Sequence, residues 1–580
     1  MKCPAMSVPA AARHGSMFRF GKPTKDPLAD AKTAARWLGG FPAHDPLGMH
    51  AAVLAELGRV TERDAKRTPS RLEAVFHLDA HTDSLRKMLT AQYLDHGNRS
   101  TRVENQLWQA LFDLAQGLLL CYQAFAREVS KHPQSNKWQS LLPELVARQV
   151  IHRGFDAKIR LFRYEQWIPA RWSDLHALFQ MACSAQIERQ AVAALAEGAM
   201  TTIEQEYLRV LVLQLMNSGN LTPRHLEWVS EQLSEWCAPL RLSLESSTVT
   251  TFYVDLGSRG GLKRRGAQPL EGRVLFLDTR PLHAVLMQNV VMLDQQVRNN
   301  PLSERTPRRA EQLSLLTKLA SQVDPDFKPL VRRGERTNAE GNVDAIIGFS
   351  KIAGFLRDDE MLPFIEGRRT PGSTFGDTVE IATFGRMRNE QASTLEMARR
   401  RLANYAAPGG SWEIRDMSQT GFRLVAPMSV INAVTLGTLA AIRPQNETLW
   451  TLGIVRRMKR LTTERAEIGL QVIANNLVGV ELLEQRRNDD DYSVDGETTV
   501  NNRRFNALFL SLQKRESEPV VQTLVVPPGE YQPGKRMRMN VGQASKKIAF
   551  GRLLEQHPDW AWATVESVDQ APRRAAAAAR

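Results

Sequence analysis

The segment Trp412-Glu-Ile-Arg-Asp416-Met-Ser418-Gln-Thr-Gly421-Phe-Arg-Leu-Val425 decides the fold of the C-terminal part of this chain. Alternating apolar and polar residues stand on both sides of an Asp-x-Ser-x-x-Gly sequence, which predicts two short strands joined by a turn. Asp and Ser side chains bond nearby backbone groups in such turns, and we expect Gly421 to supply the positive φ that closes this one. An ordinary β-turn has the same composition, so the function of the motif has to be judged from its neighbours.

The neighbours of this turn form an ordered series of basic and strand-like segments. Upstream, a basic segment with Arg-x-x-x-Arg spacing is followed by an apolar run that predicts a strand. Downstream, two further runs alternate as half-buried strands do. In chain order these segments are Lys328-Pro-Leu-Val-Arg332-Arg333-Gly-Glu-Arg336, residues 343–349, the Trp450-x-x-Gly-x-Val-Arg456 sequence and residues 466–472.

This series resembles the plan of PilZ domains, bacterial β-barrels that bind the second messenger cyclic di-GMP. In that family, Arg-x-x-x-Arg stands just before the first barrel strand and Asp-x-Ser-x-x-Gly stands at the second. The resemblance spans residues 328–485 and implies an antiparallel β-barrel there. The two motifs are further apart than is usual in the family, and we expect residues 355–411 to be a long insertion, disordered or loosely helical.

Arginine suits cyclic di-GMP, a dianion with two guanines, because its planar fork can bond phosphate oxygens or the O6/N7 edge of guanine. The resemblance implies that Arg332 and Arg336 bind the ligand in this way, with Arg333 as a substitute. The arginines at 399–401 are closer to the turn, but they lack the Arg-x-x-x-Arg spacing and no strand directly follows them. We therefore rank them second.

The turn residues complete the implied site. Asp416 and Ser418 would accept and donate hydrogen bonds to the second guanine, and Gly421 would permit close approach of the backbone. Some PilZ domains have lost ligand binding and act as protein adaptors, so a degenerate site in this chain is the alternative.

Composition places the chain among multidomain globular proteins. It has 580 residues, which exceeds one hydrophobic core, with 43% hydrophobic and 24% charged residues. A net charge of +13 favours anionic partners such as nucleotides. The four cysteines form no CxxC pair, which suits a reducing cytosol, and no apolar run approaches the roughly 18–20 residues of a membrane helix. We therefore expect a cytoplasmic protein without a membrane span.

The whole chain is predicted to be a multidomain α+β protein. Apolar residues at three- and four-residue steps predict an N-terminal helical array, followed by a mixed α/β segment, the PilZ-like barrel and a second small antiparallel barrel. The expected divisions are a flexible region 1–58 with a short helix near Ala51-Leu57, helical domain 59–239, mixed segment 240–327, barrel 328–485, second barrel 497–567 and disordered tail 568–580.

Two loops have weaker signals. The basic sequence Gly257-Ser-Arg-Gly-Gly-Leu-Lys-Arg-Arg-Gly266 could hold phosphate, but it lacks the known phosphate-loop spacings, so a hairpin loop is the preferred interpretation. Asp489-Asp-Asp-Tyr-Ser-Val-Asp-Gly496 lacks the bidentate glutamate of a calcium loop and is interpreted as an acidic linker.

The histidines have no metal-ligand spacing, and no catalytic motif is present. We therefore predict no enzyme activity, no metal and no cofactor.

Three functions remain as hypotheses. The first is a cyclic di-GMP effector that couples ligand binding to a protein partner, which would bind through the helical domain and control motility, adhesion or biofilm formation. The second is an interaction scaffold that does not bind the nucleotide. The third and least favoured is binding of RNA or DNA through basic loops, which strong salt dependence would reveal.

Overall fold

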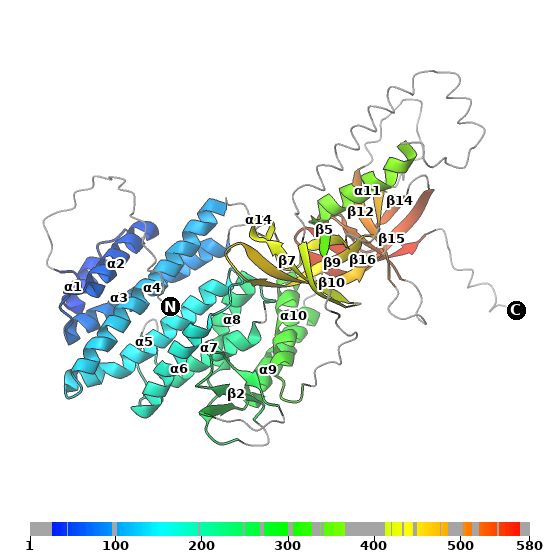
Figure 1. Cartoon of the computed structure of the whole chain (residues 1–580). Coiled ribbons are helices and arrows are strands. Elements are labelled where there is room, and N and C mark those ends of the chain that lie inside the picture. The colour runs from blue at the N-terminus through cyan, green and yellow to red at the C-terminus, as the bar shows by residue number, and fades with distance from the viewer. Residues whose placement is uncertain are drawn as a thin grey trace, which may run out of the picture. The chain divides into compact units, whose positions relative to one another are not determined.

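The protein divides into two compact units in this computed structural model. One comprises Met1–Ile159 with Asp174–Tyr207, and the other comprises Arg160–Ser173 with Leu208–Arg580. Figure 1 shows the whole chain, coloured by residue number. The structure describes residues 26–42, 45–95, 101–194, 198–217, 219–246, 250–266, 272–299, 306–327, 337, 341–365, 412–418, 420–431, 434–444, 449–475, 477–484, 503–512, 521–541 and 544–568.

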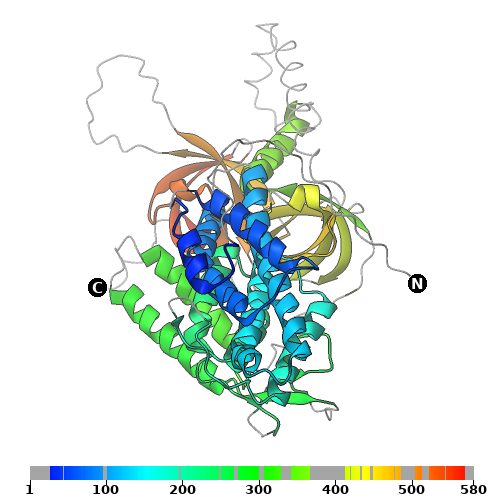
Figure 2. The ribbon, with the colours of Figure 1, turned by 90° about the vertical axis from the view of Figure 1, so that its left-hand side faces the viewer.

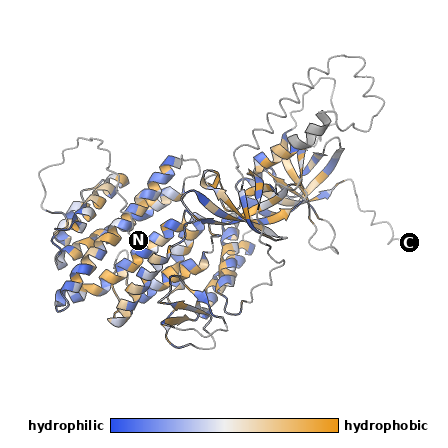
Figure 3. Ribbon diagram, viewed as in Figure 1, coloured by the Kyte–Doolittle hydropathy of each residue, from blue (hydrophilic) through white to orange (hydrophobic). Residues whose placement is uncertain are grey.

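Helices make up the N-terminal part of the chain. Figure 3 shows hydrophobic and hydrophilic residues mixed along them, as expected of amphipathic helices that bury one face. The expected helical array is confirmed. Its helices are α1 (Ala31–Leu38), α2 (Pro46–Thr61), α3 (Pro69–Leu94), α4 (Thr101–Lys131), α5 (Asn136–Leu161), α6 (Pro169–Ser184), α7 (Ile203–Met216) and α8 (Pro223–Trp236).

The first two helices lie within or close to the expected flexible region 1–58, and α2 includes the short helix expected near residues 51–57. Asp30 caps α1 by accepting from the N–H of Thr33, and Asp45 caps α2 by accepting from the N–H of Gly48. Leu38 of α1 and several residues of α2 are buried, and the helices pack against α3 and α4 respectively. Capping and burial thus fold short segments whose sequence shows little periodicity. Residues 1–25 lie outside the described residues.

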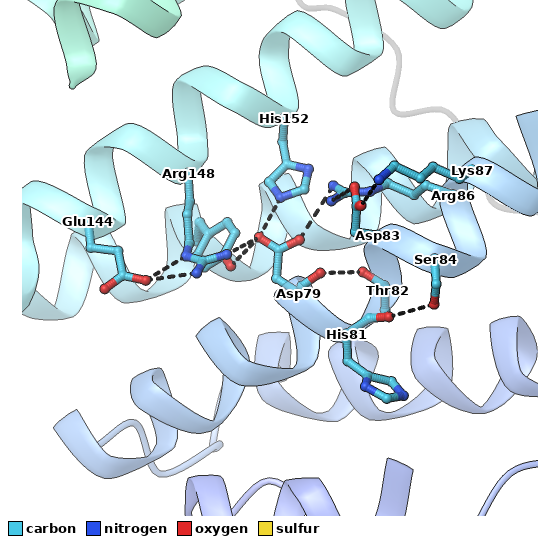
Figure 4. Close-up of polar contacts among 11 residues, drawn as sticks. Asp79, His81, Thr82, Asp83, Ser84, Arg86, Lys87, Glu144, Arg148 and His152 are labelled. Carbon is cyan, nitrogen blue, oxygen red and sulfur yellow. Dashed lines mark hydrogen bonds and ion pairs between the residues drawn. The ribbon is translucent and has the colours of Figure 1, made fainter. Parts of the chain in front are cut away.

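The core of the first unit contains a buried carboxylate, Asp79 of α3 (Figure 4). Its Oδ2 accepts hydrogen bonds from Tyr122 Oη at 2.7 Å, Arg148 Nη1 at 3.0 Å and His152 Nε2 at 2.7 Å. Arg86 Nη1 lies 3.5 Å from the other oxygen, Oδ1. The network joins α3 to α4 and α5, so one charge connects three helices.

The second unit also contains a small mixed segment of strands and helices within residues 240–327, as expected. Its sheet has the strand order β1-β4-β2-β3, and the glycine-rich loop joins β2 to β3 as the predicted hairpin. Two helices follow side by side, as Figures 1 and 2 show. The elements are β1 (Leu242–Ser243), β2 (Phe252–Asp255), β3 (Lys263–Arg264), β4 (Val274–Leu277), α9 (Arg280–Asn299) and α10 (Thr306–Val323).

The first barrel closes in the order β10-β7-β6-β5-β8-β9, and every pairing is antiparallel. Inward-facing residues such as Trp412, Leu424 and Ile468 fill its interior. The predicted barrel is confirmed. Its elements are β5 (Asn342–Ile347), β6 (Trp412–Ser418), β7 (Gly421–Pro427), the short helix α14 (Met428–Ile431), β8 (Leu439–Pro444), β9 (Thr451–Arg460) and β10 (Arg465–Ala474).

A helix replaces the start of the expected insertion 355–411. The strand β5 ends at Ile347, and α11 (Phe349–Ile365) begins almost at once. Phe349, Ile352 and Leu356 of α11 are buried in a hydrophobic cluster that also contains residues of both barrels. The apolar spacing of these residues is therefore explained by packing of α11. Residues 366–411 lie outside the described residues.

The second barrel closes in the order β11-β12-β13-β16-β15-β14. Its first strand, β11, lies within the range 328–485 that the sequence assigned to the preceding barrel, but it pairs with β12 and β14. The elements are β11 (Leu477–Glu484), β12 (Arg504–Leu512), β13 (Val521–Val526), η2 (Pro528–Glu530), β14 (Arg536–Val541), β15 (Ala544–His557) and β16 (Trp560–Ser567). Within the described residues, no helix combines the length and the apolar character needed to cross a bilayer.

Candidate functional site

The Asp-x-Ser-x-x-Gly sequence forms the hairpin between β6 and β7. Ser418 pairs with Gly421, and Asp416 pairs with Arg423. The register shifts between Ile414 and Asp416, which leaves Arg415 as the extra residue of a β-bulge. The bulge lets Ile414 point into the barrel while Asp416 lies on the outer face beside Arg423.

Asp416 is buried although it belongs to the outer face, with 5% of its surface exposed. Its Oδ2 lies 2.7 Å from Nη2 of Arg423, and Nη1 of Arg423 lies 3.9 Å from Oε2 of Glu467 on β10. An oriented, partly desolvated carboxylate of this kind is a strong hydrogen-bond acceptor. Arg423 was not among the predicted site residues, although it stands directly before the buried Leu424 and so faces outward within the segment quoted first.

Ser418 and Gly421 close the hairpin. Ser418 Oγ donates to the carbonyl oxygen of Gly421 at 3.3 Å, so the serine stabilises the turn in this structure. The expected positive φ at Gly421 is wrong, because this residue already belongs to β7 and its φ lies outside the left-handed region. Glycine is required for a different reason, since a Cβ there would lie 2.7 Å from the carbonyl oxygen of Leu470.

We expect the substitution Gly421→Ala to destabilise the first barrel by about 1–3 kcal/mol, because the new methyl group would overlap a backbone atom of β10. Thermal unfolding followed by near-UV circular dichroism would show a lower midpoint for the transition that includes this barrel. Gly529→Ala is the control, since no atom lies within 4 Å of its added Cβ. Equal midpoints for both variants would contradict the close approach at Gly421.

The predicted arginines lie outside the described residues. This applies to Arg332, Arg333 and Arg336, and also to the second-ranked arginines at 399–401. The described residue that follows Arg336 is Thr337, and it forms an antiparallel bridge with Met417, which stands between Asp416 and Ser418. Both hydrogen bonds of the bridge measure 3.1 Å between the nitrogen and oxygen atoms. The structure thus brings the residue next to the Arg-x-x-x-Arg segment to the hairpin.

The other sites considered from the sequence were a metal site, a calcium loop and a phosphate loop. For the first of these, the described part of the chain contains no group of three or more His, Cys, Asp or Glu side chains arranged to hold a metal ion. The acidic segment 489–496 lies outside the described residues. The glycine-rich loop after β2 is stabilised by its own contacts, since Asp255 accepts from the N–H of Gly257 at 2.9 Å.

Comparison with protein families gives two matches. Residues 32–247 match the N-terminal domain of the cyclic-di-GMP receptor FimW, and residues 377–477 match the middle PilZ domain of the same receptor. Together the two matches cover more than half of the chain. The second match includes Asp416, Ser418 and Gly421 and the arginines at 399–401, and it begins after Arg336. No curated protein matches the chain.

Proposed function

Because the chain belongs to the cyclic-di-GMP receptor FimW family, we propose that it is an effector that binds cyclic di-GMP at the β6–β7 hairpin and passes the signal to a protein partner. The bridge between Thr337 and Met417 is the observation that supports this site best. Arg336 is bonded directly to Thr337, so the bridge supports a site that combines the Arg-x-x-x-Arg segment with Asp416 and Ser418.

The chemistry of this site follows from its side chains. Arg332 and Arg336 supply cationic forks for the phosphates and the guanine edges, and Arg333 is the substitute. Asp416, oriented by Arg423, accepts from the N–H groups of guanine, because an ionised carboxylate is an acceptor with about four lone-pair sites. Ser418 donates to the ligand after giving up its 3.3 Å bond to Gly421. The protein needs no cofactor and performs no catalytic step in this proposal.

Contacts within the second unit offer a route from the barrel to helical segments. The N–H of Met458 donates to the carbonyl oxygen of Gly219 at 2.8 Å, and the N–H of Arg460 donates to that of Tyr164 at 2.9 Å. Arg460 also forms an ion pair with Glu165 at 2.9 Å. These contacts attach two turns between helices to β9. Ligand binding would shift the equilibrium of this attachment and change the hold of the helical domain on its partner in the cytoplasm.

Isothermal titration with cyclic di-GMP tests the proposal. We expect saturable binding by the wild-type chain and an affinity about ten- to a hundredfold lower for Asp416→Ala, since loss of one charge-assisted contact costs about 1.5–3 kcal/mol. Asp344→Ala is the matched control, because Asp344 forms a comparable cross-strand ion pair with Arg443 at 3.0 Å on the same barrel.

A folded wild-type chain that gives no binding heat would contradict nucleotide binding and would favour the ligand-independent scaffold. Equal affinities of wild type and Asp416→Ala would contradict the position of the site, but the chain would still be a cyclic di-GMP-binding protein.

A further inference from the structure

Four residues form a row across neighbouring strands on the outer face of the first barrel. Asp416 of β6 is opposite Arg423 of β7, Arg423 is opposite Gly469 of β10, and Gly469 is opposite Arg457 of β9. Residues directly opposite one another project to the same face of a sheet. That face is the outer one, because the adjacent residues point into the barrel core; these are Leu424, Ile468 and Met458.

Gly469 leaves this row open in the middle. Neighbouring strands lie about 4.8 Å apart, so the backbones of Arg423 and Arg457 are separated by roughly 10 Å with only a glycine between them. A side chain at 469 would fill that space, and its Cβ would lie 3.1 Å from Cβ of Arg457. Arg423 and Arg457 therefore stand on the two sides of a residue that has no side chain, and Asp416 stands on the far side of Arg423, so these four residues form a strip across the strands.

Arg457 differs from the other arginines around it. Arg423, Arg456 and Arg460 are each paired with a carboxylate, of Asp416, Glu555 and Glu165 respectively. Arg457 is exposed, and none of the ion pairs among the described residues includes it. Its charge is therefore available to an anion that approaches the strip.

The turn between α7 and α8 holds the stem of Arg457. A Cβ on Gly219 would lie 3.3 Å from Cγ of Arg457 and 2.4 Å from the carbonyl oxygen of Met458, so this glycine packs closely against β9. Gly219 has φ +83°, and Asn217 Oδ1 accepts from its N–H at 3.0 Å. A fixed turn thus limits the directions that the Arg457 side chain can take.

We propose that Arg457 is a further ligand-contacting residue of the nucleotide site, which binds a phosphodiester group of cyclic di-GMP over Gly469. The inference rests on the proposed function, because it assumes that the ligand lies beside Asp416. Guanidinium binds phosphate in bidentate fashion, and an arginine with no carboxylate partner gives up no ion pair when it does so. The ligand would then extend along the row from Asp416 to Arg457.

Titration of the full chain with cyclic di-GMP tests this role. We expect Arg457→Ala to lower the affinity about tenfold and Arg457→Lys to lower it less, because lysine keeps the charge and the stem but loses the fork. Arg538→Ala removes an exposed arginine of the second barrel and serves as the charge-matched control, with unchanged affinity. If Arg457→Ala does not fold, the comparison of Arg457→Lys with the wild type still tests the role of the guanidinium group.

The outcomes separate the two proposals. Binding by wild type with equal affinity for Arg457→Ala overturns the role of Arg457 and leaves the proposed function standing. An equal loss in Arg457→Ala and Arg538→Ala reflects net charge alone and also overturns it. No binding by wild type contradicts the proposed function itself.

Discussion

Replacing Asp79 with alanine is expected to destabilise the α3–α5 core of the first unit by about 3–5 kcal/mol, the range found when one partner of a buried ion pair is removed. The variant would leave Arg148, His152 and the hydroxyl of Tyr122 buried without the oxygen that accepts from all three. The side chains of Arg148 and His152 are 5% and 0% exposed, so water cannot easily replace the carboxylate.

The titration of the network gives this effect a defined pH dependence. Burial alone raises the pKa of Asp79, but the hydrogen bond from His152 and the charges of Arg86 and Arg148 outweigh burial and hold that pKa well below its usual value. A carboxyl whose folded-state pKa is lowered stabilises the fold above its unfolded pKa of about 4, and this stabilisation is lost as the pH falls further. The difference between wild type and Asp79→Ala should therefore be constant near neutral pH and shrink below about pH 4.

His152 adds a second acid-sensitive contribution. Burial lowers its pKa, more than the attraction of Asp79 raises it, so the imidazole is neutral when folded. Its Nδ1 has no hydrogen-bond partner among the described residues, which agrees with a proton on Nε2 alone. Unfolding allows the ring to bind a proton below about pH 6.5, so wild-type stability should begin to fall there as the pH decreases.

Hydrogen exchange of peptides from α3, α4 and α5 in the full chain measures this prediction locally. Exchange in Asp79→Ala should be at least a hundredfold faster at neutral pH, which corresponds to about 3 kcal/mol. Asp83→Ala is the control one turn along α3, because Asp83 pairs with Lys87 and Arg86 at the surface (Figure 4) and should cost no more than about 1 kcal/mol. Similar exchange rates in the two variants would show that the Asp79 network does not hold these helices together.

Local sequence signals predicted much of this fold, and the reasons differ between elements. Thr222 and the proline after it predicted the start of α8, because capping depends on neighbouring residues, and Thr222 does accept from the N–H of His225. The alternation at 466–472 predicted β10, because inside and outside positions repeat every two residues. Such signals lie within a few residues of one another and can be read without knowing the tertiary structure.

Long-range contacts were not predictable in this way. Asp79 looks like a surface carboxylate in its helix, and its acceptor role depends on Tyr122 and His152, which are 43 and 73 residues away. The strand β11 reads as a continuation of the first barrel, and only its pairing with β12 shows that it belongs to the second. Within the candidate site, the motif predicted Asp416, whereas the partnership with Arg423 depends on the bulge at Arg415.

The double variant Arg332→Ala/Arg336→Ala is expected to lose at least a hundredfold in affinity for cyclic di-GMP, since each lost charge-assisted contact costs about 1.5–3 kcal/mol. Its comparison is the triple variant Arg399→Ala/Arg400→Ala/Arg401→Ala, which removes more charge from the chain. Both variants and the wild type would be titrated under the same conditions, with circular dichroism as the check of folding. If net charge alone set the affinity for cyclic di-GMP, the triple variant would bind more weakly than the double variant. Weaker binding by the double variant would therefore show that Arg332 and Arg336 contribute more than their charge.

The two sets of arginines are supported by different observations. The family match begins at residue 377 and so includes the arginines at 399–401 but not Arg332 and Arg336. The bridge from Thr337 to Met417 supports the earlier pair, because it joins the chain directly after Arg336 to the residue between Asp416 and Ser418. We expect the double variant to lose more affinity than the triple variant, since a guanidinium must reach the ligand beside Asp416 to bind it. Loss of binding in the triple variant alone would show that the arginines at 399–401 bind the ligand. The bridge between Thr337 and Met417 would then only stabilise the hairpin.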